Sequence, residues 1–138
     1  MEKIFNGEIC KYFRITESIG QKGPYATIKI VDTNELDNHT AAKIALGFHK
    51  YVSLIAKSRV RGDIPETSRY NTVLDLVHIA DVDKDGISAV SNLNEWHKSF
   101  NKDTPIKILN CQNQVYRKFA TSHFNIKDLV MSHEFDGL

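Results

Sequence analysis

The sequence predicts an α/β fold: a single domain over residues 1–138 with a mixed β-sheet, in which an antiparallel hairpin precedes parallel βαβ strands, packed with about three to four helices. Two runs of β-branched and aromatic residues, 8–16 and 25–31, are separated by Gly20 and Pro24, and this pattern indicates a hairpin. Strand-like and helix-like segments then alternate over the second half, which implies parallel strands joined by right-handed crossovers. The length of 138 residues is near the common size of one domain.

The segment after the hairpin predicts a long helix that ends at about Lys57. Its N-cap candidates are Asp37, Asn38 and Thr40. The apolar residues that recur at helical spacing, and so predict the face turned to the core, are Ile44, Phe48, Val52 and Ile55. The polar stretch 58–71 contains Gly62 and Pro65, and we expect an exposed loop there.

The run VLDLVHIA, residues 73–80, is almost continuously apolar, which predicts a central strand covered on both faces. His78 lies inside this run and is expected to be a core or partly covered residue. A second helix is predicted from about Gly86 to Phe100. Its inward face is expected to hold Val90, Leu93, His97 and Phe100.

The last third of the chain predicts a short strand over 104–109 and a third helix over 112–123. Val115 and Phe119 are the inward-facing residues of that helix. A final short helix or strand is expected over 126–131. The predicted order is therefore β-β-α-β-α-β-α with one terminal element.

Composition excludes several classes of protein. The chain has 18 Lys and Arg against 17 Asp and Glu, so its net charge of +1 gives no whole-chain argument for binding nucleic acid or an anionic membrane. No apolar run approaches the ~20 residues that span a bilayer, so no direct membrane insertion is expected. Cys10 and Cys111 form no CxxC pair, and two reduced thiols in a cytoplasmic protein are expected.

An acidic turn precedes the second helix and resembles the start of a calcium loop. Asp81, Asp83 and Asp85 supply the spacing of D-x-D-x-D-G, but Asn92 stands where a bidentate Glu is needed and Ser88 where an apolar residue is usual. A strand, not a helix, is predicted before the turn. The pattern therefore favours carboxylates at a helix N-terminus, with Asp85 capping the amides that follow it. We expect no metal and no other cofactor.

Three segments together resemble the STAS domain family, the fold of anti-sigma-factor antagonists. Residues 73–76 (VLDL) lead to a corner at 83–87 (DKDGI), which is similar to the family's D-S-x-G-L at a strand-to-helix turn. Residues 34–41 (NELDNHTA) resemble the motif before the family's first helix, and 107–124 resemble its last strand and helix. The likeness extends from about Ile9 to Leu129, although the loop over 59–71 is longer than in compact members.

The resemblance implies a small bacterial regulator of transcription that acts by protein–protein binding and is not an enzyme. Its partner would be a serine kinase with anti-sigma activity, an anti-sigma factor or a larger signalling assembly. The partner-binding residues carried over from the family's corner are Asp83, Lys84, Asp85, Gly86 and Ser88.

Lys84 occupies the position of the family's phosphorylated Ser or Thr, and a lysine cannot accept that phosphate. Three interpretations remain open. The protein is a constitutive binder, or Asp83 and Asp85 imitate the phosphorylated state, or the switch has moved to Ser88 or Ser91.

Two other functions are consistent with the sequence. The first is a STAS-like accessory subunit of a transporter ATPase in lipid trafficking, and the second, less supported, is a calcium-dependent sensor. Catalysis has the weakest support, because the chain has no Gly-rich phosphate loop, no G-x-S-x-G elbow and no metal-ligand spacing among its six histidines.

Overall fold

A computed structural model describes residues 3–65 and 67–138 and contains one four-stranded mixed sheet with strand order β1-β2-β4-β6. The strands of this sheet are β1 (Phe13–Gly20), β2 (Gly23–Ile30), β4 (Asn71–Asp75) and β6 (Lys107–Leu109). β1 and β2 pair antiparallel, whereas β4 runs parallel to both β2 and β6. The predicted hairpin and the predicted parallel strands are thus both confirmed.

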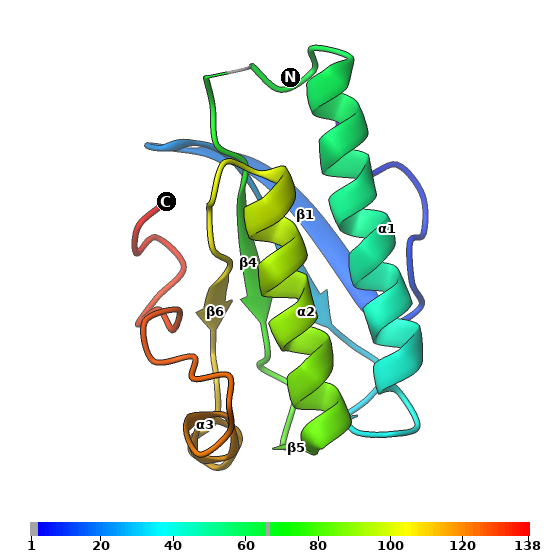
Figure 1. The fold of residues 1–138 in the computed structure, drawn as a ribbon, viewed down its shortest axis with the longest axis vertical. Helices are drawn as coiled ribbons and strands as arrows, with labels where there is room; N and C mark the ends of the chain where they lie inside the picture. The colour runs from blue at the N-terminus through cyan, green and yellow to red at the C-terminus, as the bar shows by residue number, and fades with distance from the viewer. Residues whose placement is uncertain (1–2, 66) are drawn as a thin grey trace.

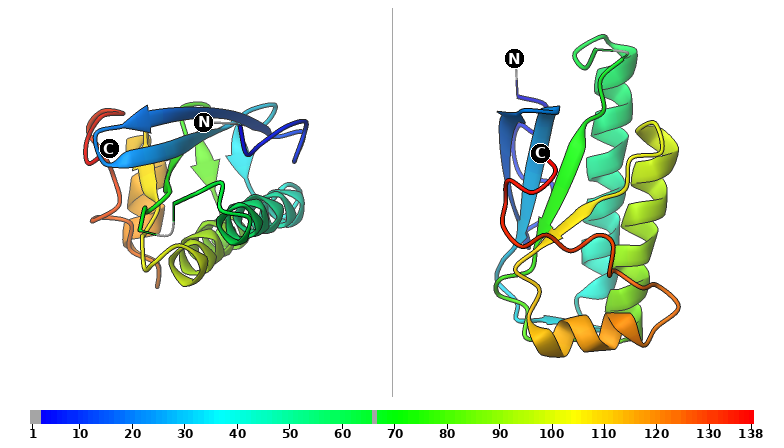
Figure 2. Two further views of the ribbon diagram at one scale, coloured as in Figure 1. Left: turned by 90° about the horizontal axis from the view of Figure 1, so that it is seen from above. Right: turned by 90° about the vertical axis from the view of Figure 1, so that its left-hand side faces the viewer.

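Three helices complete the fold: α1 (Ala41–Val60), α2 (Lys84–Phe100) and α3 (Asn113–Ala120). α1 and α2 lie side by side over one face of the sheet, and α3 crosses below the lower end of the sheet (Figures 1 and 2). Two further short strands, β3 (Glu35–Leu36) and β5 (Asp81–Val82), pair parallel beside the start of α2. None of the helices in the described part of the chain combines the length and apolar character that crossing a membrane requires.

The main core lies between the sheet and the two long helices. The alternation predicted for β2 is confirmed, since Ala26, Ile28 and Ile30 are fully buried while Thr27 and Lys29 between them are partly exposed. The predicted inward stripe of α1 is confirmed as well. Its buried large residues are Ile44, Phe48, Tyr51, Val52 and Ile55.

A smaller apolar cluster covers the opposite face of the sheet. Val73 and Leu109 pack there against Met131 and Leu138 from the C-terminal segment. This segment runs along the side of the sheet away from α1 and α2 (Figure 2). Val130 makes a parallel bridge to Ile108, so the last predicted element is an irregular segment with one strand-like residue beside β6.

The apolar run 73–80 is a strand over less than half of its length, and the prediction of one strand was wrong. β4 ends at Asp75, whose Oδ1 accepts the Val77 N–H at 3.0 Å and turns the chain. His78 is consequently exposed, not buried. Apolar composition predicted a covered segment, but the side chain of Asp75 ends the strand.

Several boundaries and one face also differ from expectation. α2 begins at Lys84 instead of Gly86, and β6 begins at Lys107 instead of residue 104. The first strand begins at Phe13 instead of residue 8, and α1 continues through Val60. Phe100 is 53% exposed at the end of α2, because the helix runs past the edge of the core there, whereas His97 is fully buried as predicted.

A chain of hydrogen bonds crosses the core and joins both long helices to β4. The Tyr51 hydroxyl lies 2.6 Å from Thr72 Oγ1, which lies 2.7 Å from His97 Nε2. His97 Nδ1 lies 2.6 Å from the carbonyl oxygen of Thr104. A carbonyl can only accept, so Nδ1 carries the proton and Nε2 accepts from Thr72. Burial lowers the pKa of His97 to about 4, which keeps the imidazole neutral.

Candidate functional site

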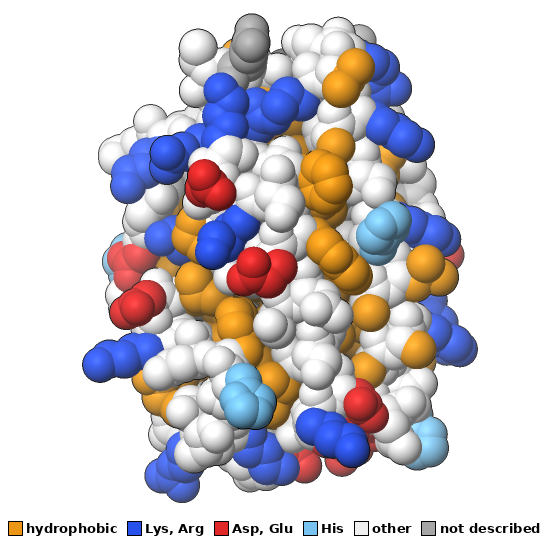
Figure 3. Space-filling model, in the orientation of Figure 1, with side chains coloured by type: hydrophobic (Ala, Val, Ile, Leu, Met, Phe, Trp, Pro, Cys, Tyr) orange, Lys and Arg blue, Asp and Glu red, His pale blue; other side chains and the backbone are white. Residues whose placement is uncertain are grey.

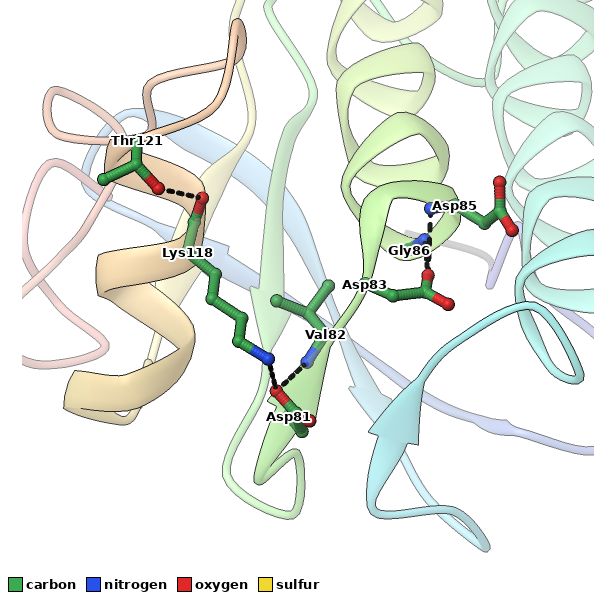
Figure 4. A network of polar contacts seen from close by, with 7 residues as sticks. All are labelled: Asp81, Val82, Asp83, Asp85, Gly86, Lys118 and Thr121. Atoms are coloured by element: carbon green, nitrogen blue, oxygen red, sulfur yellow. Dashed lines mark hydrogen bonds and ion pairs between the residues drawn. The ribbon is translucent and has the colours of Figure 1, made fainter.

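The acidic turn forms a corner between β5 and α2, and Asp83 is the residue that builds it. Its Oδ1 accepts the backbone N–H groups of Asp85 and Gly86 at 2.9 and 3.0 Å (Figure 4). These are two of the N–H groups that a helix leaves without partners at its start. The N-cap is therefore Asp83, and the prediction that Asp85 caps the helix was wrong by two residues.

Asp83 also ties the corner to the segment before α1. Its Oδ2 accepts the backbone N–H of Asn38 at 3.0 Å, and its own N–H donates to the carbonyl oxygen of Leu36 at 3.0 Å. Both carboxylate oxygens are thus engaged within the fold. Asp83 therefore has less free acceptor capacity than an unbound carboxylate for imitating a phosphate.

Gly86 lies in the first turn of α2, where the helix approaches β3 closely. A Cβ at this position would lie 2.2 Å from the carbonyl oxygen of Leu36 and 2.7 Å from its Cβ. The glycine is needed for packing and is buried. Its side of the helix is not available to a partner.

The remaining predicted site residues lie on the surface of α2. Lys84, Asp85 and Ser88 are exposed, and Ser91 is partly exposed one turn later. The structure therefore divides the predicted partner-binding residues in two. Asp83 and Gly86 hold the corner together, whereas Lys84, Asp85 and Ser88 present side chains to solvent.

A hollow of about 370 Å³ opens beside the corner, between β3, β5 and α3. Its charged lining is mostly acidic. The charged residues around it are Glu35, Asp37, Asp81, Asp83, Lys84 and Lys118. Lys118 of α3 forms an ion pair with Asp81, and its hydrogen bond to that carboxylate lowers the pKa of Asp81 (Figure 4).

The side chains of Glu35 and Asp37 contact each other at the edge of this hollow. A hydrogen bond with the Asp37 side chain is the main cause that raises the pKa of Glu35. Partial burial raises the pKa of Asp37, but the backbone N–H of His39 and the contact with Glu35 outweigh it and leave that pKa lowered. The two carboxyl groups therefore differ in acidity, Glu35 being the weaker acid of the pair.

A second hollow, also about 370 Å³, continues from the first along α2 toward the end of α3. Lys84 and Ile87 line both hollows, and Phe124 adds an apolar wall to the second. Ser88 and Ser91 lie on its α2 side. The two hollows form one groove, the corner groove, along the side of α2 that faces α3.

The three aspartates of the turn do not converge. Asp81 points toward Lys118, Asp83 toward the start of α2, and Asp85 away from both (Figure 4). Within residues 3–65 and 67–138, no group of three or more His, Cys, Asp or Glu side chains is arranged to hold a metal ion. The described turn thus lacks the converging ligands of a calcium loop.

The remaining candidates for a reactive group are two isolated cysteines and one buried histidine, and none of them lines the corner groove. Cys10 and Cys111 are free thiols, and burial raises the pKa of Cys111 to about 11, so it is a poor nucleophile at neutral pH. His97 belongs to the core network described above. Neither cysteine therefore contributes a reactive group to the corner groove.

No protein-family model matches the sequence, and no curated protein matches it. Several solved structures do match this chain. SpoIIAA, an anti-sigma factor antagonist in its unphosphorylated form, superposes with a TM-score of 0.50 at 13% identity, covering 90% of this chain and 91% of that one. The chain has the STAS fold.

Two structures of an anion transporter share the STAS fold over a smaller part of their length. The murine Slc26a9 transporter in its inward-facing state matches with a TM-score of 0.55 at 15% identity, over 81% of this chain and 17% of the transporter. A second structure of SLC26A9 matches with a TM-score of 0.50 at 16% identity, over 78% and 18%. The chain spans less than a fifth of these transporters' length.

Sequence reasoning located the corner of the STAS fold but not the groove beside it. Lys118 of α3 and Thr121 just after this helix complete the groove, more than thirty residues after Asp81. No local pattern indicates this approach, because it depends on how α3 crosses the end of the sheet. The bond between Asp83 and Asn38, 45 residues apart, was missed for the same reason.

Proposed function

We propose that this chain is a STAS-like regulatory module that binds a protein partner at the corner groove. The exposed first turn of α2, with Lys84, Asp85 and Ser88, supplies the contact. The partner is a serine kinase with anti-sigma activity, an anti-sigma factor or a signalling assembly in a bacterial cytoplasm. The module acts by binding and carries out no catalysis.

The single observation that carries this proposal is the match to SpoIIAA over nearly the full length of both chains. The corner supports it, because Asp83 and Gly86 fix the first turn rigidly while its other side chains remain exposed. A backbone that is already fixed loses little conformational entropy on binding. The groove presents Lys84 beside four carboxylates, which favours a partner surface with an acid opposite Lys84 and Lys or Arg around that acid.

Lys84 cannot be phosphorylated, so this position does not switch binding off and the module binds its partner constitutively. Both carboxylate oxygens of Asp83 already accept backbone N–H groups within the fold. Imitation of a phosphate would therefore depend mainly on Asp85. Ser88 lies one turn after Lys84 and lines the same hollow. A phosphate on Ser88 would form an ion pair with Lys84, which offers a second route to regulation.

The test is affinity capture from the native cell followed by identification of the bound proteins. We expect a serine kinase, an anti-sigma factor or a signalling assembly, and we expect Lys84→Glu to reduce capture at least tenfold. An added acid in the first turn stabilises a helix, so loss of capture by this variant would not result from unfolding.

Lys127→Glu provides the matched control, since it makes the same charge change at an exposed site outside the groove. Capture of metabolic enzymes alone, unchanged in Lys84→Glu, would contradict the proposal.

A second function is favoured by a different observation: the same fold forms part of a transporter chain in Slc26a9. This chain could accordingly serve as an accessory subunit of a transporter ATPase. Co-purification with a membrane ATPase, in place of a kinase or anti-sigma factor, would favour this second function.

A further inference from the structure

The outward side of α1 carries a row of basic residues with no acid among them. Lys43, Lys50 and Lys57 are exposed and follow one another at seven-residue intervals, so they lie along one line of the helix. At ~1.5 Å per residue the row is roughly 21 Å long. No Asp or Glu occurs between Asp37 and Asp63. The net charge of +1 therefore conceals a strongly basic helix.

Helix stability does not explain this row. The positive end of the helix dipole lies at the start of α1, where acids stabilise and cations destabilise. α1 has no acid in its first turn, and Lys43 is its third residue. A cation at this position opposes the dipole, whereas Lys57 and Arg59 in the last turn favour it.

Apolar side chains lie exposed beside the row. Val60 is 88% exposed, Leu46 57% and Phe100 53%. Val60 and Phe100 line one hollow of about 660 Å³ at the ends of α1 and α2, together with Ile64 and Pro65. An apolar band runs between the two helices in Figure 3, with basic residues along the α1 side of the band.

Among the described residues, two acids near this surface are paired with basic neighbours. Asp63 forms an ion pair with Arg61 at 3.3 Å, and Glu95 of α2 pairs with Lys98 at 4.0 Å. Among the described residues, Lys43, Lys50 and Lys57 make no ion pair. The surface that these lysines form with Leu46, Val60 and Phe100 is called the basic face below.

The chemistry of the basic face distinguishes among occupants. Lysine is depleted at protein–protein interfaces, which prefer arginine. A second copy of this chain would bring like charges together. Nucleic acid would leave the exposed Val60 and Leu46 unused. Lysines beside aliphatic and aromatic residues are the composition of a surface that lies on an anionic bilayer, with the lysine heads at the phosphates.

We propose that the basic face binds peripherally to a membrane containing anionic lipids, with α1 parallel to the bilayer surface. Lys43, Lys50 and Lys57 contact lipid phosphates, and Val60 and Phe100 enter the headgroup region. Peripheral contact requires no membrane-spanning helix. The inference is independent of the proposed function, because none of the residues of the basic face lines the corner groove.

The test is co-sedimentation of the purified full chain with vesicles of phosphatidylcholine, with or without about one third phosphatidylglycerol. We expect binding only to the anionic vesicles, weakening as salt rises. Each lysine near an anionic surface contributes about fivefold to the partition coefficient, so Lys50→Gln with Lys57→Gln should lower it roughly 30-fold. Val60→Ser with Phe100→Ser should weaken binding without changing its salt dependence.

Lys22→Gln with Lys127→Gln is the matched control, because it removes the same charge from exposed sites outside the basic face. We expect this control to bind nearly as wild type. No preference for anionic vesicles would overturn the proposal, as would an equal loss in the control pair. Tighter binding to duplex DNA or to an acidic peptide than to vesicles, with the same dependence on Lys50 and Lys57, would also overturn it.

Discussion

Asp83 joins three parts of the chain through a single carboxylate. It caps α2 and accepts from Asn38 in the segment before α1. We expect Asp83→Ala to lower the free energy of unfolding by about 2 kcal/mol, because an N-cap contributes about 1 kcal/mol and the Asn38 amide loses its partner as well. Asp83→Asn should cost less, since its amide oxygen can still accept from the helix. Urea unfolding measures both values.

The control for this prediction is Asp85→Ala, which removes a carboxylate two residues away. Asp85 is exposed and makes no capping bond, so its removal should change stability by less than ~0.5 kcal/mol. Equal losses in the two variants would mean that helix-dipole charge, not the cap geometry of Asp83, stabilises the corner.

Gly86 is expected to tolerate no larger residue. An added Cβ would meet the backbone of Leu36 at 2.2 Å, and backbone cannot move aside as a flexible side chain can. We expect Gly86→Ala to destabilise the protein by about 1–3 kcal/mol, although alanine is the better helix former. Thermal unfolding by circular dichroism would measure this, with Ser88→Ala as a control that should be nearly neutral. A stabilised Gly86→Ala protein would show that α2 can shift away from β3.

At the scale of elements, the buried network makes the packing of α1, β4 and α2 depend on pH. The pKa of His97 is about 4 in the folded protein against an ordinary value of 6.5. Between pH 6.5 and pH 4, His97 binds a proton in the unfolded chain but not in the folded chain. Its contribution to the free energy of unfolding is therefore fully present above pH 6.5 and is lost as the pH falls toward 4. The loss from this residue is about 3 kcal/mol.

Denaturant unfolding at pH 7 and pH 4.5 tests this dependence in wild type and in His97→Gln. The variant should be less stable at pH 7, because it disturbs the bonds to Thr72 and Thr104, but its stability should fall less on acidification. His123→Gln removes an exposed imidazole and should keep the wild-type fall. If His97→Gln lost as much stability as wild type between pH 7 and pH 4.5, the acid sensitivity would come from carboxylates and not from His97.

Sequence patterns predicted those elements whose determinants are local. The hairpin, the inward stripe of α1 and the strand-to-helix turn at 83–87 each depend on residues within a few positions of one another. The end of β4 at Asp75 was missed because one polar side chain overrides an apolar run. The exposure of Phe100 and the network around His97 could not be predicted, since both depend on where separate helices meet.

At the scale of the whole molecule, charge is separated along α2. The corner groove at its start is lined by four carboxylates, Glu35, Asp37, Asp81 and Asp83, and two lysines. The hollow at its end lies beside the basic face. α2 has 17 residues, so at ~1.5 Å per residue the Val60 and Phe100 end of the basic face lies roughly 25 Å from the corner groove. A partner at the groove and a bilayer at the basic face could therefore bind at the same time.

This separation predicts that the two surfaces act independently. Effects of substitutions more than about 10 Å apart that share no contacts are usually additive. Lys84→Glu should reduce capture of the protein partner and leave vesicle binding unchanged, whereas Lys50→Gln with Lys57→Gln should do the reverse. The triple variant should show both losses at their separate magnitudes, measured by capture and by co-sedimentation on the same preparation. If Lys84→Glu alone released the protein from vesicles, the membrane contact would involve the corner, and the assignment to α1 would be wrong.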